Sequence, residues 1–483
     1  MTAPSADTAE TYDLLVVGGG PAGLAAAAEA ADTGLSVGLV DERPTFGGQI
    51  YKQFGLGFDV RSPSALGRDY LRGRRLIEAV ERRAVRLMPS TSAVAIRGTE
   101  VVLVGPGLPA RVVNARRVLL APGAHDRPVV FPGWTLPGVL TAGAAQAIVK
   151  TQRVLPGRRL VFAGSGPLAL AFPAQLAHYG ASVALTIEAG PRPGARDVLR
   201  LAAAARGNLG LLRDAAVYRA QLYRARVPLR YGRIVVRAEG EVRVEAVVHA
   251  AVDADWRVVP GTEERVEADT LCVGYGFFPS VELLRLAGCD FAYDEDLGGP
   301  VVAVDAWMRT TVAGISAAGD GAGVGGAFVA ADEGRLAALG AALDLAALTG
   351  AEAERRAGPA RARLHRKQAF RSALRRLHTI GPGIYELATD DTVVCRCEEI
   401  GTAELEAAVA SSADLNVVKG FTRAGMGLCQ GKSCQRQIAA LVARRHGLAI
   451  GAVPAVTPRL PVRPVPIGAI ADARLEDAGF FTR

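Results

Sequence analysis

The sequence predicts an α/β fold of two similar units, followed by a small, mostly helical domain. Two stretches, residues 12–41 and 158–188, each run from a short apolar strand through a glycine turn into a helix, a second strand and an acidic residue. This order is typical of a Rossmann-like dinucleotide-binding unit. Four of the six cysteines then gather between residues 395 and 434, among stretches with a helical pattern.

Composition excludes several classes of protein. Half of the 483 residues are apolar and 22% are charged, which is a globular balance with material for about three domains. No apolar run is long enough to span a membrane, and the N-terminus lacks the basic and apolar segments of a secretory signal. The net charge is +8, but aromatic residues are only 6% and do not alternate with the basic ones. We therefore expect no nucleic-acid partner.

The first unit carries a full G-x-G-x-x-G pattern directly after the strand YDLLVV. Gly18 makes the tight turn, Gly20 lets a pyrophosphate approach the backbone, and Gly23 lets the helix pack on the strand. Free N–H groups at the helix start favour the phosphates. An acid follows 23 residues after Gly18, where it can bind ribose hydroxyls. The expected cofactor-binding residues here are Gly18, Gly20, Pro21, Ala22, Gly23, Asp41 and Glu42.

A second glycine turn, Gly48-Gln49 in DERPTFGGQIY, suits a ligand that continues past the pyrophosphate. With it, the chain resembles the flavoproteins that have two dinucleotide-binding domains. LLAPGAHDRP resembles their crossover segment, and ISAAGDGAGVGGAFVAADEGRLAA resembles their closing segment. The resemblance implies FAD, with an aspartate beside its pyrophosphate and ribitol and a helix start aimed at the flavin. The further residues that it implies are Gly48, Gln49, Ala121, Gly123, Gly319, Asp320 and Ala327.

The second unit fits G-x-G-x-x-A. Gly164 and Gly166 form its turn, and Glu188 follows Gly164 by 24 residues, where an acid favours NAD over NADP. Pro173 falls inside the expected helix, which we expect it to kink. Two interpretations stay open: the unit binds NAD(P), or it is retained as structure alone. No C-x-x-C accompanies either glycine turn, which excludes the disulfide-reductase mechanism.

Cys395, Cys397, Cys429 and Cys434 have the spacing C-x-C, 31 residues, C-x4-C. Four thiolates in two close pairs can hold a [2Fe–2S] cluster or Zn, and an unmetallated segment is the third interpretation. Glycines beside the second pair free N–H groups for sulfide and thiolate, which favours the charged cluster. The segment resembles the bacterioferritin-associated-ferredoxin-like [2Fe–2S] domain, in the wider-spaced version fused to flavoprotein subunits. Clustered cysteines of this kind indicate the reducing cytoplasm.

Two stretches flank the cysteine segment. Residues 361–378 hold seven basic residues and no acid, which favours an amphipathic linker helix with a solvated basic face over a docking face. Five prolines between residues 454 and 466 predict an extended tail that packs on the FAD domain or on a partner. The expected domains are an FAD domain split over 1–125 and 258–346, an NAD(P)-like domain at 126–257, a basic linker helix at 347–385, a [2Fe–2S] domain at 386–450 and a Pro-rich tail at 451–483.

GGQIYKQ, the crossover segment and CRCEE…GLCQGKSC together resemble the flavoprotein α (A/B-type) subunits of heteromeric dye-linked dehydrogenases. That family includes opine oxidase, proline or hydroxyproline dehydrogenase, and hydrogen cyanide synthase. The resemblance implies oxidation of an amino-acid-like C–N bond to an imine. It implies a second, amino-acid-oxidase-like flavoprotein subunit that holds the amine substrate, and a small ferredoxin-like subunit is a further candidate partner. No catalytic residue is evident. The alternatives are a self-sufficient NAD(P)H-dependent oxidoreductase and a non-catalytic electron-transfer scaffold.

Overall fold

The computed structural model describes residues 10–55, 57–58, 60–205, 209–375 and 377–471. Its largest sheet has seven strands in the order β3-β2-β1-β6-β5-β4, with β19 beside β6. The strands are β1 (Thr11–Val17), β2 (Val37–Val40), β3 (Val85–Met88), β4 (Ser92–Arg97), β5 (Glu100–Val104), β6 (Arg111–Leu120) and β19 (Ile315–Ala317). The strands around β1 are parallel, whereas β5 and β4 continue the sheet in antiparallel pairs.

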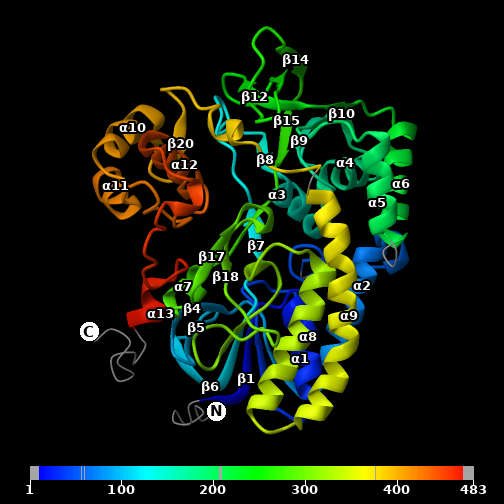
Figure 1. Cartoon of the computed structure of the whole chain (residues 1–483), viewed down its shortest axis with the longest axis vertical. Coiled ribbons are helices and arrows are strands. Elements are labelled where there is room, and N and C mark those ends of the chain that lie inside the picture. Colours follow the sequence, from blue (N-terminus) through cyan, green and yellow to red (C-terminus); the bar gives the residue numbers. More distant parts are fainter. Residues whose placement is uncertain (1–9, 56, 59, 206–208, 376, 472–483) are drawn as a thin grey trace.

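Helices α1 (Pro21–Ala31), α8 (Ala327–Asp344) and α9 (Gly350–Arg375) stack beside this sheet (Figure 1). α1 and α8 approach closely because their facing residues are small: a side chain at Gly334 would overlap the carbonyl group of Ala22. Alanines of both helices form a buried cluster with the inner residues of β1 and β2. The glycine turn between β1 and α1 is therefore held between a sheet and a tightly packed layer of helices. None of the described helices is long and apolar enough to cross a membrane.

A second sheet, entirely parallel, has the order β11-β10-β9-β15-β8. Its strands are β8 (Val139–Thr141), β9 (Arg159–Gly164), β10 (Ser182–Glu188), β11 (Leu229–Tyr231) and β15 (Thr270–Gly274). Its helices are α3 (Ala142–Ala147), which continues as a π-helical turn (Ile148–Gln152), α4 (Leu168–His178), α5 (Ala195–Ala204) and α6 (Leu209–Arg224). α4 runs through Pro173 without interruption. The α/β class and its two Rossmann-like units agree with the prediction.

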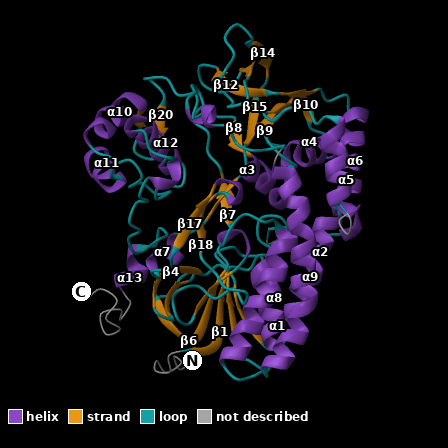
Figure 2. Cartoon of the chain, in the orientation of Figure 1, coloured by secondary structure: helices purple, strands orange, loops and turns teal. Residues whose placement is uncertain are grey.

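Shorter elements complete and connect the units. Three antiparallel strands, β12 (Arg233–Glu239), β13 (Ala246–Ala251) and β14 (Glu264–Glu267), cap the second sheet. Two ribbons, β7 (Ala124–Asp126) with β16 (Phe277–Pro279) and β17 (Phe291–Asp294) with β18 (Gly299–Val302), lie where the chain passes between the units (Figure 2). α2 (Arg68–Glu81) and α7 (Glu282–Leu286) pack nearby. The chain thus leaves the first unit after β6 and returns to it at β19.

α9 runs along the molecule from α8 to α5 (Figure 1). Its basic face is not simply solvated. Arg363 and Lys367 both bind the carboxylate of Asp332, which is only 2% exposed, with N–O distances of 2.7 and 2.8 Å. The interpretation of residues 361–378 as a solvated face is wrong at these positions, because helical spacing alone does not reveal a buried acid on a neighbouring helix.

The cysteine segment forms a separate helical lobe (Figures 1 and 2). Its elements are β20 (Val393–Cys395), β21 (Ile400–Gly401), α10 (Thr402–Ser411), α11 (Leu415–Thr422) and α12 (Gln435–His446). The described part of the proline-rich tail then returns to the first unit and includes α13 (Ile467–Ala471). Val462 N–H donates to the Val94 carbonyl (2.9 Å), and Ala110 N–H donates to the Ala469 carbonyl (2.7 Å). The tail therefore packs on β4 and the β5–β6 loop.

Candidate functional site

The first glycine turn joins β1 to α1 and contains two kinds of glycine. Gly18 has φ +110°, and a side chain there would overlap the Ala121 carbonyl oxygen. A side chain at Gly23 would overlap the Gly18 carbonyl oxygen. Gly20 differs, because a Cβ there would meet only the Gly48 Cα, at 3.8 Å. Gly18 and Gly23 are thus required by the protein's own packing, whereas Gly20 leaves an open cradle at the start of α1.

The acid after β2 folds back onto this turn. Asp41 accepts hydrogen bonds from the backbone N–H of Gly19 (2.6 Å) and of Arg43 (2.8 Å). Burial raises the pKa of Asp41, and the two N–H donors oppose that rise. The carboxylate is 9% exposed and retains lone pairs for ribose hydroxyls. Glu42 instead lies on the surface, 3.5 Å from the guanidinium of Arg463.

Two distant segments pack against the same turn. The N–H of Gly47 donates to the Gly19 carbonyl (2.9 Å), and a Cβ at Gly48 would lie 2.9 Å from the Gly20 Cα. Ala121 N–H donates to Val17 (2.8 Å), which fixes the crossover segment beside β1. The predicted cofactor residues of these segments therefore gather at the carboxyl end of β1, the expected place for a ligand in such a sheet.

The closing segment brings Asp320 to this place. Gly325 and Gly326 donate backbone N–H bonds of 2.9 and 2.8 Å to Asp320 Oδ1, and no described residue donates to Oδ2. Burial raises the pKa of Asp320, and the two glycine N–H groups counter it. Gly319 has φ +73°, and its N–H donates to Glu333 (2.8 Å). α8 begins at Ala327, directly after these glycines.

These features fit FAD. A side chain at position 20 would fill the cradle that Gly20 leaves open. No side chain caps the start of α1, and the first turn of α1 contains no acidic residue. Such a helix start attracts phosphate. Asp41 and Asp320 each keep free lone pairs beside it, which suit ribose and ribitol hydroxyls.

The second glycine turn repeats this geometry with one difference. Glu188 accepts N–H bonds from Gly166 (3.0 Å) and Gly190 (2.8 Å), much as Asp41 does in the first unit. However, the Leu377 carbonyl oxygen would lie 2.6 Å from a Cβ at Gly190, and His378 Nδ1 lies 3.7 Å from Glu188. The chain after α9 therefore covers the acid and the turn where the adenosine half of a dinucleotide would lie.

The four cysteines lie at one end of the helical lobe. Gly425 N–H donates to Cys395 Sγ (3.4 Å), and Cys434 is the residue before α12. A hydrogen bond from the Cys434 thiol, together with backbone N–H donors, lowers the pKa of Cys395 to about 5 and raises that of Cys434. Cys397 and Cys429 form the second hydrogen-bonded pair. Among the described residues, no group of three or more His, Cys, Asp or Glu side chains is arranged to hold one metal ion.

Ion pairs join the cysteine lobe to the first unit. Lys432, between Cys429 and Cys434, binds Glu282 at 3.0 Å. Arg436 of α12 binds Glu295, and the same carboxylate accepts from Arg127 at 2.9 Å. Arg127 is 1% exposed, and Arg436 also stacks near Phe278. A cavity of about 370 Å³ lies between the lobe, His125 and the tail. The cysteines are thus held in a defined position against the first unit.

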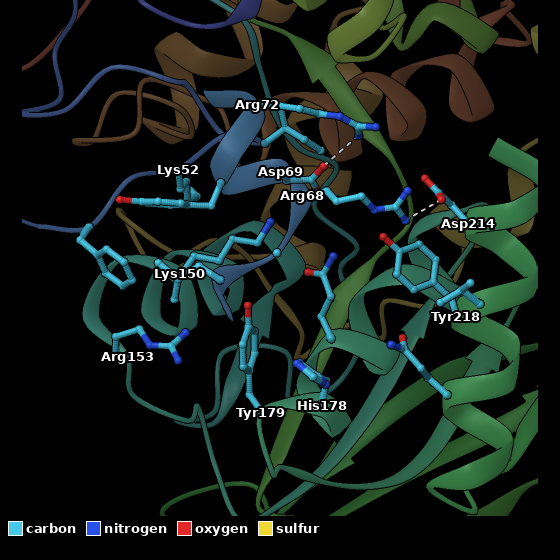
Figure 3. A pocket seen from close by; sticks show the side chains of 18 residues that line it. Lys52, Arg68, Asp69, Arg72, Lys150, Arg153, His178, Tyr179, Asp214 and Tyr218 are labelled. Carbon is cyan, nitrogen blue, oxygen red and sulfur yellow. Dashed lines mark hydrogen bonds and ion pairs between the residues drawn. The ribbon is translucent and has the colours of Figure 1, made fainter. Parts of the chain in front are cut away.

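Two lysines, one buried and one half-buried, were missed by sequence reasoning. Lys52 follows Gln49 by three residues and binds its Oε1 at 2.5 Å, while Lys150 lies on the turn after α3. Both line a cavity of about 320 Å³ between the two units (Figure 3). The one available signal was that GGQIYKQ carries one of the chain's five lysines. Nothing in the pattern around Lys150 could have placed it opposite Lys52.

Two glycine turns, each following a strand of a parallel β-α-β unit, with an open cradle in the first, indicate an oxidoreductase with two dinucleotide-binding folds. The chain belongs to the pyridine nucleotide-disulphide oxidoreductase family, whose model matches residues 12–210 and 215–337. Residues 390–474 match the sarcosine oxidase A3 domain. The protein is an FAD-dependent oxidoreductase, and the predicted relationship is confirmed.

Relatives extend over nearly the whole chain. The opine oxidase A chain of Agrobacterium tumefaciens is 34% identical over 96% of this chain and 92% of that protein. Hydrogen cyanide synthase subunit HcnB of Pseudomonas aeruginosa is 33% identical over 96% and 99%. The fold is similar to that of L-proline dehydrogenase from P. horikoshii, with a TM-score of 0.67 and 21% identity over 97% of this chain and 81% of that one.

Proposed function

We propose that this chain is the FAD-carrying component of a heteromeric dehydrogenase that oxidises a C–N bond of an amino-acid-like substrate. Electrons would pass from FAD to a [2Fe–2S] cluster and on to an acceptor. The observation that carries the proposal is the ion-paired attachment of the four-cysteine lobe to the unit that has the open cradle. Relatives from opine oxidase and hydrogen cyanide synthase support the substrate class and the heteromer.

The first unit supplies the FAD site. Backbone N–H groups of Gly20, Ala22 and the rest of the first turn of α1 would face the pyrophosphate. Asp41 would accept from the ribose through the remaining lone pairs of its two oxygens, each of which already accepts one N–H bond. Asp320 would accept from the ribitol through Oδ2, since both of its N–H bonds go to Oδ1. Bound FAD supplies the ability to take up two electrons and release them singly. The protein's part is to hold and orient it.

The cysteine lobe supplies the cluster ligands. Four thiols in two pairs match the donor set of a [2Fe–2S] cluster, in which each iron takes two protein sulfurs. Gly425 already donates an N–H to one of these sulfurs, and the start of α12 faces the same region. Both features stabilise negative charge. Zn and an unmetallated lobe remain the alternatives that a metal analysis separates.

Because the glycine turn of the second unit is covered, we do not expect NADH to be the electron source. The Leu377 carbonyl and the His378 ring occupy the space beside Glu188 that an adenosine ribose needs. Of the two competing functions, the self-sufficient NAD(P)H oxidoreductase requires this segment to move away. The non-catalytic scaffold would require that FAD bound in the cradle takes no part in electron transfer. We therefore assign the middle domain a structural role and leave the general base to the partner.

The heteromer sets the remaining expectations. An amino-acid-oxidase-like flavoprotein subunit would hold the amine substrate, and a small ferredoxin-like subunit is a further candidate partner. We place the assembly in the reducing cytoplasm, because four clustered cysteines indicate metal binding rather than disulfides. The predicted ranges, 1–125 with 258–346, 126–257, 347–385, 386–450 and 451–483, are retained as proposed domains.

Reconstitution tests the proposal. This chain is co-expressed with a candidate amino-acid-oxidase-like flavoprotein subunit, and dye reduction is measured with opines, proline, hydroxyproline and glycine. We expect activity with at least one substrate only when both chains are present. A matched pair, Cys429→Ser and Cys272→Ser, separates the cluster from a cysteine buried in the second sheet. Full dye reduction by the partner alone would contradict the proposal.

A further inference from the structure

A cavity lies between the two units, apart from both glycine turns. Its volume of about 320 Å³ is within the range of small-ligand sites. The segment after Gln49 and the start of α2 form one wall, and the turn after α3 with the ends of α4 and α6 forms the other (Figure 3). The two walls come from different units, which is a common setting for a binding site.

Charge in this cavity is unbalanced. Two of its arginines have acidic partners: Arg68 binds Asp214 at 2.6 Å, and Arg72 binds Asp69 at 3.4 Å. The remaining three cationic side chains, Lys52, Lys150 and Arg153, form no ion pair with any residue in the described part of the chain. Figure 3 shows these three together on the side away from the Arg68–Asp214 pair. This side of the cavity therefore has basic groups without counter-charges.

Two of the three unpaired cations are held by other contacts. Lys52 is 5% exposed and donates to Gln49 Oε1 at 2.5 Å. The Arg153 guanidinium lies 4.8 Å from the centre of the Tyr179 ring. Burial, reinforced by the nearby Arg43 and Lys150, lowers the pKa of Lys52 to about 7. Lys52 is buried, Lys150 is half-buried and Arg153 is exposed at the mouth of the cavity. Keeping a buried cation without a counter-charge beside two further cations costs free energy, unless an anion compensates them.

We propose that this cavity binds a small polyanion carrying at least two carboxylate or phosphate groups, held by Lys52, Lys150 and Arg153. Charge-assisted hydrogen bonds from two lysines and a guanidinium suit such a ligand. The Tyr179 and Phe54 rings both lie near the Arg153 guanidinium and form part of the apolar wall. The site contacts the segment after Gly48-Gln49, so an anion bound here would act beside the FAD site without being part of the cradle.

Binding to the purified full-length chain tests the site, with pyrophosphate and succinate as separate probes in isothermal titration calorimetry. We expect at least one probe to bind, and Lys150→Gln to weaken it at least tenfold. Arg153→Gln should weaken probe binding to a similar extent, and this second variant keeps the test valid if Lys150→Gln fails to fold. Lys419→Gln removes a lysine outside this cavity and should leave affinity unchanged. Pyrophosphate alone would identify a phosphate site, and succinate alone a carboxylate site.

Affinity should also fall as the pH rises above about 7, because Lys52 then loses its proton in the free protein. The charged groups that act on Lys52 are Arg43, Lys150, Asp126 and Asp41, and of these only the two carboxylates favour its protonated form. The proposal is overturned if neither probe binds the wild-type chain, or if Lys150→Gln and Arg153→Gln bind as tightly as Lys419→Gln.

Discussion

Replacing Gly20 by alanine separates ligand binding from folding. Gly20 has φ −78° and ψ −172°, an ordinary extended conformation, and an added Cβ meets only Gly48 Cα at 3.8 Å. The FAD-free protein should therefore lose no stability, and restricting its unfolded chain should add roughly 0.4–1 kcal/mol. The same methyl group would occupy the cradle, and we expect FAD affinity to fall at least tenfold, or about 1.4 kcal/mol.

Gly23→Ala is the matched control, because its Cβ overlaps the Gly18 carbonyl oxygen inside the protein. This variant should lose roughly 1–3 kcal/mol or more of stability, as overpacked sites do. Denaturant unfolding of the FAD-free chains gives stability, and flavin retained per chain gives affinity. The assignment of Gly20 to the cradle is wrong if Gly20→Ala keeps FAD at the wild-type level, or if it is destabilised as much as Gly23→Ala.

Three further predictions concern other parts of the molecule. Cys429→Ser should remove iron and cluster absorbance while flavin stays bound, and full iron content would refute the ligand assignment. Glu295→Gln leaves the buried Arg127 without its counter-charge and should cost roughly 3–5 kcal/mol in thermal unfolding; Glu100→Gln, which breaks a surface pair, should cost under about 1 kcal/mol. Burial raises the pKa of Glu333 to about 7, so the folded state binds the extra proton and stability falls as pH rises from about 4.5 to 7. Glu333→Gln should flatten this loss, which is up to about 3 kcal/mol, and an unchanged pH profile of the melting temperature would contradict it.

Local patterns predicted the geometry of the first glycine turn, because the constraints on that turn are local. Positions 18 and 23 tolerate only glycine, because any side chain there would overlap a backbone carbonyl oxygen. The acid that accepts from this turn must lie at the end of the next strand. These constraints appear in the sequence as fixed spacings. The cysteine spacing predicted the pairs Cys395–Cys397 and Cys429–Cys434. The structure instead pairs the cysteines across the two motifs, Cys395 with Cys434 and Cys397 with Cys429.

Features that depend on distant parts of the chain were not predictable. His378 lies 190 positions after Glu188, and only tertiary packing shows that it covers that acid. Lys52 and Lys150 meet because two separate units face each other. Asp332 draws Arg363 into an ion pair that a helical pattern cannot reveal. Each of these features depends on a contact between separate elements, whereas the spacing of residues in the sequence indicates only how positions within one element are arranged.

The proposed function requires that electrons reach this chain from a partner protein and not from NADH. An anaerobic visible spectrum of the purified chain, recorded before and after NADH is added, distinguishes the two sources. We expect flavin and iron–sulfur bands that NADH leaves unchanged, because Leu377 and His378 cover the second glycine turn. Prompt bleaching of those bands by NADH would contradict this expectation, and would show that the middle domain is a working nicotinamide site.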